Sequence, residues 1–158
     1  MFTTITPEIR LKAPKLQRLY QDWDDRRQGR EFPARADFTP HDLQYLLGNL
    51  SLVDVGYNPL RFRYRLHATK LAQRMGHEMT NKSVDDIPDP SHAAQARAHF
   101  TEVVKGRVPT AYIRDPTYIT KNEPYCHVAY NSEVLVLPLS TDGTTIDMLM
   151  SALVWDKE

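Results

Sequence analysis

The chain has 158 residues, with 20 Lys or Arg and 20 Asp or Glu, so its formal net charge is zero. This length is enough for one domain with a hydrophobic core. The charge balance argues against a dedicated nucleic-acid-binding protein, because such proteins usually carry a basic excess. The single cysteine excludes an intrachain disulfide. The N-terminus lacks a signal peptide, and the longest aliphatic run, residues 134–137, is too short to cross a bilayer. We therefore expect a cytoplasmic protein with no membrane span.

The first 48 residues are predicted to be mainly helical. Pro14 suits the first turn of a helix that runs to about Gln28 and is ended by Gly29. The apolar residues of this helix form one stripe: Leu16, Leu19, Tyr20 and Trp23. The stripe either covers the sheet of its own domain, which is the commoner outcome, or forms a dimer contact. A Thr-Pro-His-Asp sequence at residues 39–42 then predicts a second helix start.

Residues 61–76 predict a strand that turns directly into a short helix. Phe62, Tyr64 and Leu66 alternate with arginines, so one face of the strand is expected to be apolar and the other cationic. Thr69 is a good N-cap for the helix, and Gly76 is placed to end it with a positive φ. The inner wall of this corner suits either a packed core or a small ligand.

The rest of the chain reads as alternating strands and helices. A strand at residues 50–55 and the strand at 61–67 form an antiparallel hairpin, because the loop between them is short. A helical turn at residues 83–87 is followed by a helix that begins at the Asp89-Pro90 pair and ends at Gly106. The remaining predicted strands are residues 108–113, one or two segments within 118–130, residues 134–140 and residues 144–155.

The last predicted strand is apolar on both faces from Met148 onward, so it should lie at the centre of the sheet with both faces covered. The Asp142-Gly143 pair before it is the strongest hairpin signal in the chain. Pro138 conflicts with a sheet interior, because proline cannot donate to a strand ladder. The preceding strand therefore needs a bulge or an unpaired amide at that residue.

This element order resembles a PAS domain, and the residues narrow the resemblance. The chain is similar to the fifth PAS subfamily, a group of bacterial PAS-like proteins, over nearly its whole length. The matching residues are Trp23, Arg27, Gly29, residues 33–37, Pro40, residues 63–66, residues 137–140 and the Asp142-Gly143 pair. Ala68 and Asn81 depart from the pattern, because glycine is expected at both positions.

The resemblance implies an α+β fold with a five-stranded antiparallel sheet in the order 2-1-5-4-3 and helices on one face. Residues 49–158 would form the PAS-like domain, and residues 1–48 a helical extension packed on the domain or in a dimer. PAS domains are sensory or interaction modules. Because the chain leaves no room for an output domain, we expect it to act through a regulatory protein partner or as a homodimer.

The cofactor signals are weak. Flavin-binding PAS domains use a helical Asn-Cys-Arg-Phe type motif, whereas Cys126 lies beside His127 on a predicted strand, so we expect no flavin adduct. Haem-binding PAS domains take an axial histidine from the region of His92 and His99, but surface or capping histidines are far commoner. The six histidines show no metal-ligand spacing, so no metal site is predicted.

The candidate ligand-binding residues are those expected to point inward: Tyr64, Leu66, Met75, Phe100, Met148 and Met150. A filled core remains an equal alternative to a ligand pocket. Arg63 and Arg65 lie on the cationic face of their strand and could contact an anion or a partner. The alternative is an outer sheet face on which the arginine stems cover Trp23 and Leu19.

The expected function is a non-enzymatic sensory or regulatory module that acts through protein–protein interaction, with a possible small-molecule ligand in its core. One alternative is a small cone-shaped α+β enzyme with a buried acid base, for which Asp147 is the candidate. The other is a pure dimerisation scaffold built on the helix at residues 14–28. No catalytic residue is predicted.

Overall fold

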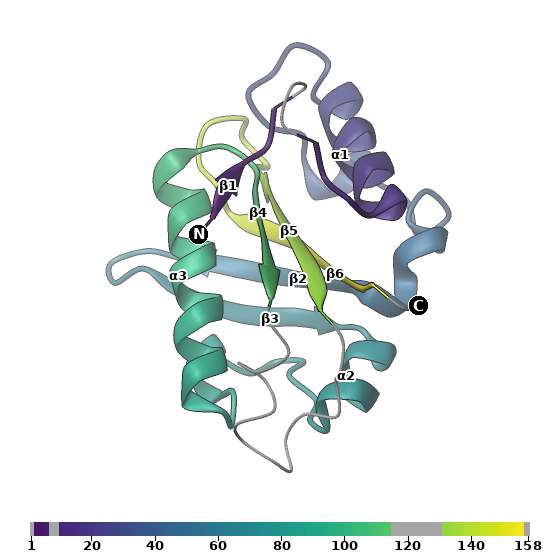
Figure 1. Cartoon of the computed structure of the whole chain (residues 1–158). Coiled ribbons are helices and arrows are strands. Elements are labelled where there is room, and N and C mark those ends of the chain that lie inside the picture. Colours follow the sequence, from purple (N-terminus) through teal and green to yellow (C-terminus); the bar gives the residue numbers. More distant parts are fainter. Residues whose placement is uncertain (1, 7–9, 115–130, 157–158) are drawn as a thin grey trace.

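The computed structural model describes residues 2–6, 10–114 and 131–156, which form one antiparallel sheet with helices on both faces (Figure 1). The predicted segments around Cys126 and His127 lie outside these residues. The elements in chain order are β1 (Thr3–Thr4), α1 (Pro14–Arg27), η1 (Arg35–Asp37), η2 (Gln44–Asn49), β2 (Leu50–Gly56), β3 (Arg61–His67), α2 (Thr69–Met75), η3 (Val84–Asp86), α3 (Pro90–Gly106), β4 (Thr110–Arg114), β5 (Ser132–Leu139) and β6 (Met148–Trp155), where η denotes a 3₁₀ helix.

The strand order is β1-β4-β5-β6-β2-β3. When β2 is counted as the first strand, the five strands from β2 to β6 have the predicted order 2-1-5-4-3. The prediction of five strands was one short, because β1 adds a sixth by pairing Thr3 with Ala111 and Thr4 with Thr110. A two-residue strand has no detectable period, and only its contact with β4 makes it a strand.

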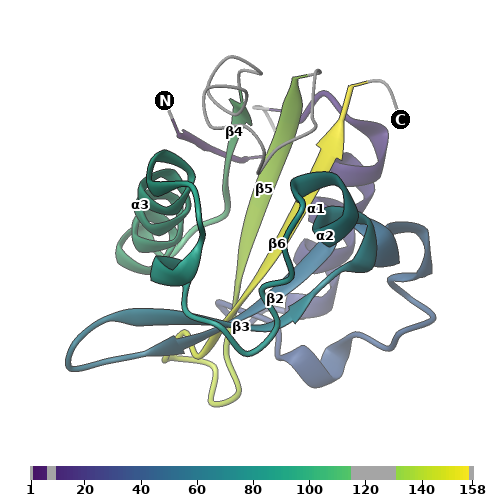
Figure 2. The same cartoon turned by 90° about the horizontal axis from the view of Figure 1, so that it is seen from below.

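The central position of β6 is confirmed. It pairs with β5 on one side and β2 on the other, and Leu149, Met150 and Ala152 are completely buried. Helices α3 and α1 lie on opposite sides of the strands (Figures 1 and 2). A strand covered on both faces carries apolar residues without alternation, which explains its sequence.

The apolar stripe of α1 packs on the sheet of the same chain. Leu16, Leu19 and Trp23 are buried, so the stripe is not available to a second copy as the dimerisation alternative requires.

Pro138 fits into β5 without disrupting the sheet. The Trp23 indole N–H donates to the Pro138 carbonyl at 2.8 Å. The N and C=O of one strand residue point to the same side, so the Pro138 nitrogen also faces away from β6. Since β4 begins at Thr110, opposite Val136, it does not reach Pro138, and the missing amide breaks no ladder there.

Two helix starts differ from their predictions. Thr39 and Asp42 cap each other, with the Thr39 amide donating to Asp42 Oδ2 at 2.8 Å and the Asp42 amide to Thr39 Oγ1 at 3.2 Å. However, the chain continues as a turn and the short 3₁₀ helix η2, because β2 begins directly after it. The N-cap of α2 is Ala68 instead of Thr69, whereas Gly76 ends this helix at the predicted positive φ of 79°.

The outer edge of the sheet at β3 is covered by the chain itself. The Tyr64 amide donates to the Lys82 carbonyl at 2.9 Å, and the Asn81 amide donates to the Tyr64 carbonyl at 2.7 Å. Asn81 adopts φ 68°, a conformation that asparagine tolerates better than most residues, so it replaces the glycine expected there. Covering an edge strand in this way limits edge-to-edge association. Within the described residues, no helix is long and apolar enough to span a membrane.

Glu133 on β5 attaches the start of α1 to the sheet. Its carboxylate accepts the amide of Lys12 at 2.9 Å and that of Ala13, the N-cap of α1, at 2.7 Å. Glu133 is only 9% exposed. The carboxylate therefore satisfies amides that a helix N-terminus leaves without intrahelical partners.

We expect Glu133→Ala to lower the free energy of unfolding by about 2–4 kcal/mol, because two charge-assisted hydrogen bonds disappear and two amides lose their acceptor. Urea denaturation at pH 7.5 measures the effect. Glu102→Ala, at an exposed position of α3, is the matched control. An equal loss in the two variants would contradict this account of Glu133.

Candidate functional site

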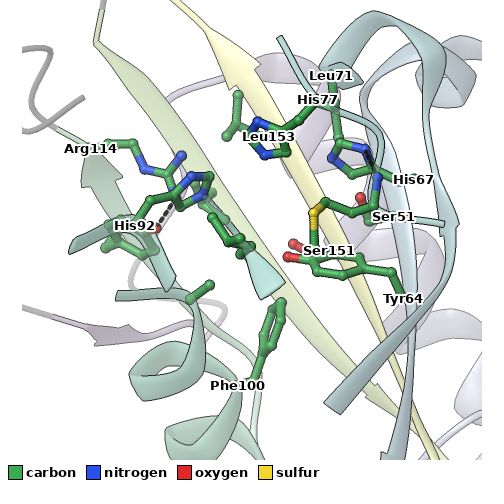
Figure 3. A pocket seen from close by; sticks show the side chains of 15 residues that line it. Ser51, Tyr64, His67, Leu71, His77, His92, Phe100, Arg114, Ser151 and Leu153 are labelled. Carbon is green, nitrogen blue, oxygen red and sulfur yellow. Dashed lines mark hydrogen bonds between the residues drawn. The ribbon is translucent and has the colours of Figure 1, made fainter. Parts of the chain in front are cut away.

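A small cavity of about 40 Å³ lies between the sheet and the segment that runs from α2 to α3 (Figure 3). The sheet contributes residues from β2, β3, β4, β5 and β6, and the helical side contributes residues from α2, α3 and the loops between them. Its polar lining includes Ser51, His67, His77, His92, Arg114 and Ser151. Four groups that carry or can acquire positive charge thus surround one small space.

A bulge in β3 decides which of its side chains reach the cavity. Leu52 pairs with Leu66 and Val53 pairs with Tyr64, so Arg65 is the extra residue in β3. The alternation reverses after the bulge, which turns His67 inward. The prediction that Leu66 points inward was therefore wrong, and 41% of this residue is exposed. An unbroken period of two could not have predicted this reversal.

His67 is held as a neutral ring. Its Nδ1 accepts the Met79 amide at 3.4 Å, so the ring proton lies on Nε2. Burial lowers the pKa of His67 to about 4, although Glu78, 3.7 Å from Nδ1, opposes this effect and His77 adds to it. The His67 amide also donates to Thr80 Oγ1 at 3.1 Å, which holds this end of β3 against the loop.

His77 and His92 continue the row of imidazoles. The rings of His67 and His77 are parallel within 8° with centroids 6.3 Å apart, and His92 lies 6.3 Å from His77. His77 follows Gly76, whose positive φ ends α2, and His92 comes from the first turn of α3. Burial and the Arg114 charge, followed by the neighbouring histidines, hold the pKa of His92 well below 6.5.

Arg114 at the end of β4 is the residue that sequence reasoning missed. It is only 4% exposed, and its Nη2 donates to the Tyr112 hydroxyl at 2.8 Å. Among the described residues, no hydrogen-bond acceptor meets its Nε or Nη1. Arg114 lies two residues after Tyr112, so the strand period could have indicated that both side chains share the cavity face.

Two predicted inward residues, Tyr64 and Phe100, do line the cavity. Their ring centroids are 6.2 Å apart in an edge-to-face arrangement, and Phe62 packs on Phe100 at 5.5 Å. Burial raises the pKa of Tyr64, while the charge of Arg114 opposes this shift. The rings of Tyr64 and Phe100 form the apolar wall opposite the charged groups.

The predicted methionines do not gather at the cavity. Ser151 and Leu153 line it, so Met148 and Met150 point to the other face of β6, toward α1. Met150 is fully buried there beside Leu52 and Leu137. The prediction erred because both faces of β6 are apolar, and the period could not separate them. Met75 ends α2, and its side chain is outside the described part of the structure.

Arg63 and Arg65 lie on the exposed side of β3. Arg65 forms an ion pair with Asp54 on the neighbouring strand at 3.1 Å, and Arg63 donates to the Asn81 carbonyl at 3.1 Å. The arginines therefore lie on an outer face, as the second alternative expected, but their stems do not cover Trp23 and Leu19, which pack on the sheet face that α1 covers. Arg63 and Arg65 remain accessible to a partner.

The remaining candidates have structural surroundings. His99 is buried away from the cavity, where Nε2 lies 2.7 Å from Thr110 Oγ1 and the ring stacks on Phe2 at 4.7 Å. A cavity of about 40 Å³ beside His92 is too small for a haem. Asp147 is half-exposed and accepts the Thr141 amide at 2.8 Å, so it is not the buried base that a cone-shaped enzyme needs. Within residues 2–6, 10–114 and 131–156, no cluster of His, Cys, Asp and Glu has the arrangement of a metal site.

The comparison with protein families decides the classification. A family model described as PAS domain matches residues 11–154. The chain belongs to the PAS domain family. The predicted resemblance, including the PAS-like α+β fold, is therefore confirmed.

Several solved structures are similar to this chain, and the first of those named here supports the fold. A sensory box sensor histidine kinase from Vibrio cholerae is 16% identical, with a TM-score of 0.51, and the match covers 70% of this chain and 83% of that one. A variant of RsLOV is 11% identical with a TM-score of 0.47, over 94% and 71% of the two chains. A fungal LOV domain photoreceptor is 14% identical with a TM-score of 0.43, over 68% and 73%. No curated protein sequence matches the PAS chain.

Proposed function

We propose that this PAS domain is a non-enzymatic regulatory module that binds a small molecule in the cavity and signals through a protein partner or a second copy of itself. The observation that carries the proposal is the composition of the cavity. A buried arginine, three histidines and two serines surround a space that a purely structural core would fill with apolar side chains. We expect the module to act in the cytoplasm.

The position of the cavity supports a signalling role. His67 belongs to the sheet, while His77 and His92 belong to the helical segment that covers it. A ligand that contacts both sides would favour one placement of this segment over another, because a ligand shifts a conformational equilibrium only through differential contacts. The segment at Asn81 to Ser83 runs along β3, so such a shift would reach the outermost strand of the sheet.

The exposed side of β3 is the surface that we propose for the partner. Arg63 and Arg65 provide cationic groups there, and Leu66 provides an exposed apolar side chain between Arg65 and the inward His67. An arginine pair beside a leucine suits an acidic and apolar segment of a partner. The bulge therefore contributes to the cavity and to the partner surface, because it turns His67 inward and Leu66 outward.

Blocking the cavity tests the proposal. We expect native mass spectrometry of the wild-type protein, together with thermal-shift screening of small metabolites, to identify a bound molecule. Ser151→Leu should abolish this binding, because the added side chain occupies the cavity, and should cost about 1–3 kcal/mol of stability. Ser91→Leu, at an exposed position of α3, is the matched control and should retain binding. Failure of every molecule to bind the wild type, or equal binding in the two variants, would refute the proposal.

A further inference from the structure

We propose that the cavity binds a small planar oxyanion, the size of formate, acetate or nitrate, with the guanidinium of Arg114 as its anchor. This inference rests on the proposed function and names the chemical class of its ligand. It depends on four observations, which concern the burial of Arg114, the groups around it, the volume of the cavity and the hydrogen-bond donors that face it.

The burial of Arg114 requires a counter-charge. The residue is 4% exposed, and within the described parts of the chain its side chain has one hydrogen bond, to the Tyr112 hydroxyl, and no ion pair. A buried cation without a partner is strongly unfavourable, and arginine cannot escape this cost by losing its proton. Nε and Nη1 lie on either side of Nη2, and the second N–H of Nη2 forms a two-donor edge with one of them, which is the arrangement that binds a planar oxyanion in a bidentate manner.

The groups nearest to Arg114 increase the positive potential. His92 lies beside the guanidinium in Figure 3, and the row continues through His77 to His67. The carboxylate of Glu78 lies at the far end of this row, next to His67. Burial and the charge of Arg114 lower the pKa of His92. A bound anion would oppose the effect of the Arg114 charge on this pKa.

The volume limits the size of the ligand. One water needs about 10–15 Å³ of cavity volume measured in this way. The observed volume of about 40 Å³ therefore holds about three or four non-hydrogen atoms. A nucleotide or a haem is far larger, whereas formate, acetate and nitrate fit.

The remaining polar groups are suitable donors. His67 accepts the Met79 amide through Nδ1, which leaves its protonated Nε2 as a donor. The hydroxyls of Ser51 and Ser151 lie on paired residues of β2 and β6 and also line the cavity. An oxyanion can accept hydrogen bonds from these groups, which gives its buried oxygens hydrogen-bond partners.

The experiment is a thermal-unfolding titration at pH 7.5 with formate, acetate, nitrate or chloride, at an ionic strength held constant with a bulky sulfonate buffer. We expect formate, acetate and nitrate to raise the melting temperature of the wild type saturably, by about 5–10 °C at a hundredfold excess over Kd. Arg114→Gln should lose this shift. Arg97→Gln removes the same charge from an exposed ion pair of α3 and should keep the shift.

Three results would overturn the inference: no saturable shift in the wild type, an equal shift in Arg114→Gln, or a shift with chloride alone. If Arg114→Gln does not fold, isotope-edited NMR of ¹³C-formate with the wild type and Ser151→Leu replaces it, and bound formate must appear only with the wild type. A neutral molecule found by native mass spectrometry without any anion effect would refute this inference and leave the proposed function standing. If neither a molecule nor an anion binds, both proposals fail.

Discussion

Lowering the pH from 7 to 5.5 is expected to destabilise the PAS domain by about 3 kcal/mol, because buried histidines resist protonation. Burial lowers the pKa of His67 to about 4 and that of His99 to about 3, against 6.5 for an unperturbed histidine. Below pH 6.5 these two histidines therefore bind protons in the unfolded chain but stay neutral in the folded chain. The free energy of unfolding is therefore highest above pH 6.5. Below pH 6.5 each of these residues lowers it by about 1.4 kcal/mol per pH unit.

The surroundings of the two histidines decide the sign. His67 faces Glu78, which favours its charged form, and His77, which opposes it, but burial is the largest influence. Around His99, burial outweighs the hydrogen bond to Thr110, and the charge of Arg114 adds to the effect of burial. Carboxylates contribute at lower pH. Backbone amides lower the pKa of Asp142 to about 2 from 3.8, so its contribution is lost only in stronger acid.

Urea denaturation at pH 7.5, 6.5 and 5.5 measures this dependence. At pH 7.5 His99→Asn should be less stable than the wild type. Below pH 6.5 its free energy of unfolding should fall by about 1.4 kcal/mol less per pH unit, because the variant lacks one histidine that is protonated only in the unfolded chain. His41→Asn, at an exposed position, is the matched control and should leave the slope unchanged. A wild-type stability that is flat between pH 7.5 and 5.5, or an unchanged slope in His99→Asn, would show that the histidines do not act in this way.

Phe100→Ala is expected to lower the free energy of unfolding by about 3–5 kcal/mol, the usual range for removing a buried aromatic side chain. Phe100 is 3% exposed, and its ring meets those of Phe62 and Tyr64. Its removal would join the lost volume to the existing cavity, since Phe100 already lines it. The neighbours cannot collapse into this space easily, because the backbone of Tyr64 is held by hydrogen bonds to Lys82 and Asn81.

Chemical denaturation at pH 7.5 tests this prediction, with Phe100→Leu as the conservative variant. Leucine keeps most of the apolar contacts, so its loss should be well below that of alanine. Val108→Ala, at an exposed apolar position after α3, serves as the control and should change the stability by about 0.5 kcal/mol or less. A loss below about 1.5 kcal/mol in Phe100→Ala would mean that the ring is not part of a packed wall.

Much of the fold could be predicted because its signals are local. The Asp89-Pro90 start of α3, the Gly76 end of α2 and the hairpin between β2 and β3 follow from backbone preferences at single residues, and the structure confirms them. The continuous apolar sequence of β6 likewise predicted a central strand, because only burial on both faces explains it. A resemblance in residues spread over the chain then indicated the PAS family.

The candidate site was less predictable because it depends on contacts between distant segments. The reversal in β3 arises from its pairing with β2, where Leu66 lies opposite Leu52 and Tyr64 opposite Val53. Because of this one extra residue, the side chain of His67 lines the cavity and that of Leu66 points outward. The burial of Arg114 could not be predicted from the sequence, because an arginine near the end of a predicted strand is usually exposed and only the packing around it shows that it is buried.

The sequence by itself determined the positions of most helices and strands, the central place of the last strand and the family, because turn residues, caps and apolar periods act over a few neighbouring residues. The tertiary structure alone decided that α1 buries its stripe on the chain's own sheet, and that three histidines and Arg114 meet around one small cavity. These features depend on strand register and on packing between segments far apart in the chain, and no local pattern encodes either of them.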